Sequence, residues 1–159
     1  CSSDLISFLF FWFGGFGRAG NLLLSHRVDR VGAGRAVGLS LGAMAVSLLL
    51  WPLGSGVAAV ALVLLPWAFA GFACNSAQQA RLSQAAPALA PALMALNTSA
   101  IYLGQALGAG GGGAVVAANA SAGRPLYDGL HWIALAWMVV ALALSTWVSR
   151  RIAVDPTHV

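Results

Sequence analysis

One charged side chain lies inside an otherwise apolar run near the start of this 159-residue sequence. This residue, Arg18, precedes Arg27 by eight positions, which is roughly 12 Å along a helix axis. A guanidinium is costly to hold in lipid, so Arg18 is expected to face a bundle interior or a watery cavity. There it would contact an anion or a carboxylate. The alternative is that its side chain snorkels toward the lipid headgroups.

Uncharged polar side chains also occur within apolar stretches. Asn97 and Gln105 are about two helical turns apart and therefore share one helix face, with Tyr102 nearby. Gln105 is expected near the membrane midplane, and Asn21 lies close to Arg18. Such groups need partners at membrane depth. They line a cavity or make hydrogen bonds between helices, and the sequence leaves both alternatives open.

Other reactive chemistry is not indicated. All four acidic residues are Asp near the ends of apolar runs, and the His and Cys residues are too scattered for a metal site. No nucleophile and base occur at a useful spacing. Gly108-x-Gly110-x-x-Gly113 matches a dinucleotide fingerprint as a string, but no strand is expected before it. We therefore expect no enzyme activity, no metal and no cofactor.

The composition shows which solvent surrounds these residues. Hydrophobic residues make up 60% of the chain and charged residues only 8%, with no Lys and no Glu. A soluble domain carries roughly 25% charged residues to cover its surface. This excludes a soluble enzyme, a soluble DNA-binding module and a disordered chain. The sequence predicts the lipid bilayer as solvent and no nucleic-acid partner, despite a net charge of +4.

Five apolar stretches are long enough to span a bilayer, which takes about 20 residues. They cover residues 5–25, 36–52, 57–78, 92–118 and 130–149. Together they predict an all-α membrane protein of five transmembrane helices. Pro66 is expected to kink the third stretch, and Pro91 suits the first turn of the fourth. Connections are predicted over 26–35, 53–56, 79–91 and 119–129.

The arginines predict the orientation, because basic residues favour the cytoplasmic side. Six fall on one side of the predicted topology: Arg27, Arg30, Arg35, Arg81, Arg150 and Arg151. Only Arg124 falls on the other side. The N-terminus is therefore predicted outside and the C-terminus in the cytoplasm. Aromatic residues expected at the membrane rims are Trp51, Tyr127 and Trp132 outside and Trp147 inside.

The first connection carries a recognisable motif. Residues 20–35 hold Gly-Asn, then Asp-Arg, then Gly, then Arg. This resembles the cytoplasmic loop signature of the major facilitator superfamily, although Ser25 stands where Gly is common. The resemblance implies a gating loop whose contacts break when a transporter opens; the alternative is a positively charged loop with an incidental Asp. The residues of this gating loop would be Arg27, Asp29, Arg30, Gly32 and Arg35.

A longer motif follows. Gln79-Ala80-Arg81 precedes a helix with Asn97-x-Ser99, then Gly104 and Gly108. This is similar to bacterial sugar and drug exporters of the arabinose efflux permease type, in the same superfamily. The resemblance covers residues from about 5 to 151. Gly104, Gly108 and Gly112 recur every four residues and predict a helix-packing face.

The resemblance implies that residues 1–159 are a partial C-terminal transmembrane domain, corresponding to spans eight to twelve of twelve. It implies export of a small molecule such as a sugar or a drug by alternating access, in the bacterial inner membrane. The implied partners are the lipid bilayer, a missing N-terminal half and the substrate. The first, third and fourth spans would face the cavity. The alternative is a non-transporting helical scaffold or subunit.

Overall fold

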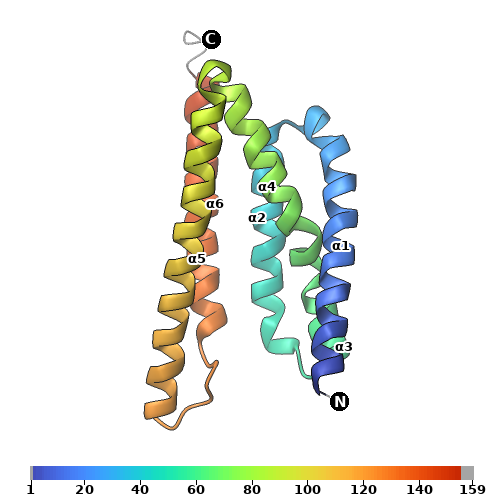
Figure 1. The fold of residues 1–159 in the computed structure, drawn as a ribbon, viewed down its shortest axis with the longest axis vertical. Coiled ribbons are helices and arrows are strands. Elements are labelled where there is room, and N and C mark those ends of the chain that lie inside the picture. The colour runs from blue at the N-terminus through green and yellow to red at the C-terminus, as the bar shows by residue number, and fades with distance from the viewer. Residues whose placement is uncertain (1, 155–159) are drawn as a thin grey trace.

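The chain folds as a series of long helices. The computed structural model describes residues 2–154, with side chains described for 4–23 and 30–151. The helices are α1 (Ser2–Val31), α2 (Ala33–Leu50), η1 (Trp51–Leu53), α3 (Val57–Val63), α4 (Leu65–Ala85), η2 (Pro87–Leu89), α5 (Ala90–Ser121) and α6 (Leu130–Val154). No strand occurs among these residues. The long helices run along the long axis of the molecule, and α1 begins at the end opposite to where α6 ends (Figure 1).

Four helical stretches of the described chain are long and apolar enough to cross a membrane. They are Ala33–Leu53, Val57–Ala85, Pro87–Ser121 and Leu130–Arg151. The all-α class is therefore confirmed, and these helices indicate a membrane protein. The predicted span over 5–25 lies on α1, which is not one of the four and holds Arg18 and Asn21 among its apolar residues.

The helix α4 organises the packing. It contacts both α2 and α1 extensively, and α2 in turn packs against α6. The side chains at the α2–α4 contact are small: Ala33, Ala36 and Val37 of α2 pack with Ala77 of α4. In lipid, small side chains allow two helices to approach closely and gain van der Waals contact. The close α2–α4 pair is thus the core of the described structure.

The predicted distortion at Pro66 is confirmed as a break between α3 and α4. Proline has no N–H, and its ring collides with the carbonyl four residues earlier, so the helix is interrupted at Leu64. The interruption leaves the N–H of Trp67 without a backbone acceptor. That N–H donates instead to the Oγ of Ser47 on α2, at 2.9 Å. A side chain of one helix therefore caps the restarted helix of another.

Two predicted connections are shorter than expected. The loop predicted over 26–35 is wrong, because α1 continues to Val31 and α2 begins at Ala33. Gly32 makes the junction alone, with φ at 88°, a backbone conformation that favours glycine. The segment 79–85 is also helical, and α4 ends only at Ala85, just ahead of Pro87. Pro91 lies in the first turn of α5 as predicted.

A polar side chain orders the turn between α5 and α6. The Nδ2 of Asn119 donates to the carbonyl oxygens of Leu126 at 3.2 Å and Asp128 at 3.0 Å. The carbonyl of Asn119 accepts from the N–H of Arg124 at 2.9 Å. Asn119 is buried, so its amide satisfies carbonyls inside the turn rather than facing solvent.

The two C-terminal helices leave most of their apolar surface open. Within the most apolar stretches of Pro87–Ser121 and Leu130–Arg151, no residue is buried against the rest of the chain. Large apolar side chains are also exposed on α1, where Phe11 is 83% exposed. Surfaces of this kind are found where lipid or another protein segment covers them.

Candidate functional site

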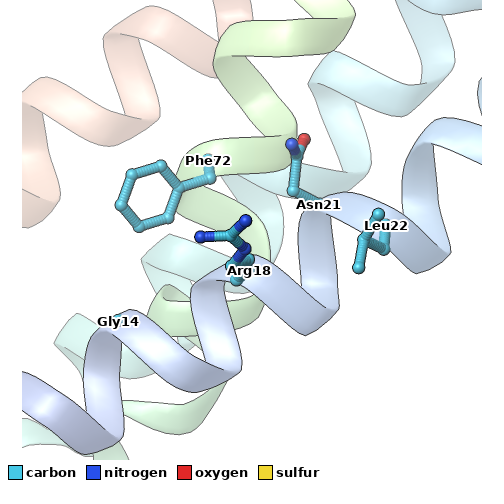
Figure 2. Close-up of a pocket in the computed structure, with 5 residues that line it drawn as sticks. All are labelled: Gly14, Arg18, Asn21, Leu22 and Phe72. Atoms are coloured by element: carbon cyan, nitrogen blue, oxygen red, sulfur yellow. The ribbon is translucent and has the colours of Figure 1, made fainter.

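A half-open pocket lies beside α1, about midway along the helix. Its volume is about 490 Å³, and it is lined by Gly14, Arg18, Asn21, Leu22 and Phe72. The four residues from α1 recur at intervals of four, three and one, which places them on one helix face. Phe72 reaches the pocket from α4 (Figure 2). A volume of this size suits a small organic molecule.

Arg18 supplies the only charge of this pocket lining. Its guanidinium extends from α1 toward the space between Asn21 and the ring of Phe72 (Figure 2). Among the residues whose side chains the structure describes, Arg18 has no hydrogen-bond or ion-pair partner. A guanidinium has five N–H donors and no acceptor, so this group is ready to bind an electron-rich ligand atom.

Asn21 is held in place by a hydrogen bond across the helix interface. Its Oδ1 accepts from the hydroxyl of Ser76 on α4 at 2.8 Å. This bond joins α1 to α4 at the pocket and fixes the orientation of the Asn21 amide. The other end of the amide, the Nδ2 group, is left for the pocket.

Two glycines, Gly17 and Gly20, set the distance between α1 and α4. A Cβ at Gly20 would collide with the backbone of Phe69, coming within 2.6 Å of its Cα. A Cβ at Gly17 would collide with the ring of Phe72. This contact was not among the predictions from sequence, although two small residues three positions apart in an apolar helix were the available signal.

The other candidate cavity residues are not part of this pocket. Asn97, Tyr102 and Gln105 lie on α5, whose main contact is with α4, and Tyr102 is 67% exposed. The structure therefore brings Arg18 and Asn21 together and leaves the three α5 residues apart from them.

Most of the predicted glycine face on α5 has no packing partner among the described residues. A Cβ at Gly104 or Gly108 would meet nothing within 4 Å. A Cβ at Gly112 would meet only the side chain of Leu130, at 3.9 Å. The face is therefore open, in contrast to the close contact at Gly17 and Gly20.

The residues predicted to form a gate lie around the α1–α2 junction. Arg30 and Arg35 are exposed on either side of Gly32. The side chains of Arg27 and Asp29 lie outside the described residues, so their contacts are not assigned. Nearby, Arg81 joins α4 to α6. Its Nη1 donates to the Oγ of Ser145 at 3.1 Å, and its Nη2 donates to the backbone carbonyl of Ser145.

The described residues hold no group of three or more His, Cys, Asp or Glu side chains arranged for a metal ion. No protein-family model, curated protein or solved structure matches the chain. Its assignment therefore depends on its motifs and on the pocket itself. That pocket can bind a small molecule through hydrogen-bond donors and an apolar wall.

Proposed function

We propose that this chain is part of the C-terminal half of a major facilitator transporter that exports a small molecule, such as a sugar or a drug. The observation that carries the proposal is the Arg18 pocket, because a lone guanidinium midway along an apolar helix marks a functional site by default. The two sequence motifs described above support the same assignment. Alternating access would expose this pocket first to one side of the membrane and then to the other.

We further propose that α1 is a fifth spanning helix. It has 30 residues, whereas a helix needs only about 20 residues to span a bilayer. It also packs along α4. Its polar residues Arg18 and Asn21 turn toward the pocket rather than toward the apolar surroundings. This arrangement supports the proposal, because a charged residue costs less in a spanning helix where it faces a cavity.

The open faces of α5 and α6 fit a chain that works within a larger assembly. An N-terminal half of the transporter would cover part of this surface, and lipid of a bacterial inner membrane would cover the rest. In this proposal the junction around Gly32 lies at the cytoplasmic rim. Asp29 and Arg30 would there make contacts that close the gate and break when it opens.

Export from cells tests the proposal. Cells without their own sugar and drug exporters would express the full protein that carries this segment, and would be loaded with labelled pentoses and fluorescent drugs. We expect faster loss of at least one compound than from cells with an empty vector. We expect Arg18→Ala to slow that loss at least about 10-fold, since one charge-assisted contact is worth that much.

Arg124→Ala is the matched control, because Arg124 is exposed in the α5–α6 turn, away from the pocket. Its export rate should equal that of the parent. Equal export by Arg18→Ala and the parent, at equal amounts in the membrane, would contradict the role of the pocket. If cells with the protein kept every compound as long as cells with the empty vector, the result would favour the non-transporting scaffold instead.

A further inference from the structure

The polar side chains of the Arg18 pocket present mainly hydrogen-bond donors. The guanidinium of Arg18 can only donate, and the Asn21 Oδ1 already accepts one hydrogen bond, from the Ser76 hydroxyl at 2.8 Å. The Asn21 Nδ2 has no partner among the described residues. Gly14, Leu22 and Phe72 add no polar side-chain atom. The pocket therefore favours a ligand that accepts hydrogen bonds.

The charge of Arg18 makes an anion the preferred ligand. No Asp lines the pocket, and the chain has no Glu. With α1 centred in a hydrocarbon core about 30 Å thick, Arg18 lies close to the midplane, beyond snorkelling reach of the lipid phosphates. A free anion that enters the pocket would supply the missing negative charge, and the apolar walls would screen that charge less than bulk water does.

The remaining walls of the pocket are apolar. Phe72 is 52% exposed and Leu22 is 60% exposed, so both offer surface to a ligand. Gly14 lies one turn from Arg18 and has no side chain, and a Cβ built there would meet nothing within 4 Å. This absence of a side chain leaves room for an apolar group beside the guanidinium.

We propose that the pocket binds an organic anion with an aromatic or apolar body, its carboxylate on Arg18 and the Asn21 Nδ2 and its body against Phe72 and Leu22. The proposal rests on the proposed function, because it names the substrate class of that same site. Arg18 and the Asn21 Nδ2 would both donate hydrogen bonds to the same carboxylate. The planar guanidinium of Arg18 matches carboxylate geometry well.

Equilibrium binding of 1-naphthoate tests this assignment. The full protein would be placed in phosphatidylcholine nanodiscs and titrated with radiolabelled 1-naphthoate. We expect saturable binding that unlabelled 1-naphthoate displaces and that the neutral analogue 1-naphthalenemethanol does not. Arg18→Gln should raise Kd about 10- to 100-fold, since it removes the charge but keeps a polar side chain. Arg124→Gln should leave Kd unchanged.

A pair of glycine substitutions separates loss of the ligand site from loss of the fold. Gly14→Leu should fill the pocket without meeting other atoms of the chain and should weaken 1-naphthoate binding at least about 10-fold. Gly15→Leu is the matched control, because Gly15 is equally open but does not line the pocket. It should bind as the parent does, and both variants should elute as the parent in gel filtration.

Three results would overturn the proposal: no saturable binding, equal displacement by the neutral analogue, or equal Kd for Arg18→Gln and the parent. Loss of 1-naphthoate binding in nanodiscs that contain phosphatidylglycerol would also overturn it, because a lipid headgroup would then be the ligand. The binding assay needs no transport. Binding without export would contradict the proposed function alone, and export of neutral sugars without anion binding would contradict the anion assignment alone.

Discussion

Two buried serines of α2 differ in a single respect. Ser40 and Ser47 are both 1% exposed, but only Ser47 has a partner, the N–H of Trp67 at 2.9 Å. The Oγ of Ser40 has no hydrogen-bond partner in the described structure. The two serine side chains are therefore equally buried, but only that of Ser47 makes a hydrogen bond.

We expect Ser47→Ala to lower the free energy of unfolding by about 1 kcal/mol, because the N–H of Trp67 would be left partly buried without an acceptor. Unfolding of the protein in mixed micelles by added denaturing detergent measures this change. Ser40→Ala is the matched control and should change the free energy by less than about 0.5 kcal/mol. An equal loss for both variants would show that the Ser47 bond is not the source of the effect.

At the scale of elements, the distance between α1 and α4 depends on Gly20. A side chain there would collide with the Phe69 backbone, so Gly20→Ala should force the two helices apart. We expect a loss of about 1–3 kcal/mol, as for other overpacked cores. Alanine is the better helix former by up to about 1 kcal/mol, which works in the opposite direction.

Gly15→Ala separates these two effects. A Cβ at Gly15 meets nothing within 4 Å, so only the gain in helix propensity should remain, and the variant should be as stable as the parent or more so. The same unfolding assay compares the two variants. A stable Gly20→Ala protein would contradict the close α1–α4 contact.

The sequence predicted the helices better than their ends. Hydropathy located the long helices, and Pro66 and Pro91 acted as expected because proline affects its own helix. The predicted loops over 26–35 and 79–91 were too long. Their polar residues contain no Gly or Pro before Gly32 and Pro87, so nothing local stops the helix.

The candidate site was predictable only in part. The sequence singled out Arg18 and Asn21 because polar groups in an apolar run stand out locally. It could not supply Phe72 or Ser76, because their approach depends on how α4 is rotated against α1, which no single stretch encodes. For the same reason it could not show that Asn97, Tyr102 and Gln105 lie apart from the pocket.

At the scale of the whole molecule, the arginines gather at one end. Helix ends at one end of the long axis in Figure 1 carry five described arginines, whereas the α5–α6 turn at the opposite end carries Arg124. The five are Arg30, Arg35, Arg81, Arg150 and Arg151. This separation supports the proposed orientation, with the arginine-rich end in the cytoplasm.

Reporter fusions test that orientation. Alkaline phosphatase joined after Leu126 should be active, because the enzyme folds only outside the cytoplasm, and phosphatase joined after Arg151 should be inactive. Green fluorescent protein at the same two positions should give the reverse pattern. Phosphatase activity after Arg151 would contradict the proposed topology.

The Asn119 turn has a consequence for biosynthesis. In the proposed orientation this turn is carried across the bilayer while the protein is being made. Bare carbonyl groups resist that passage, since hydrocarbon offers them no donor. The Asn119 amide already satisfies the carbonyls of Leu126 and Asp128, at 3.2 and 3.0 Å. A turn closed in this way would present two fewer bare carbonyl groups to the hydrocarbon as the last two helices insert.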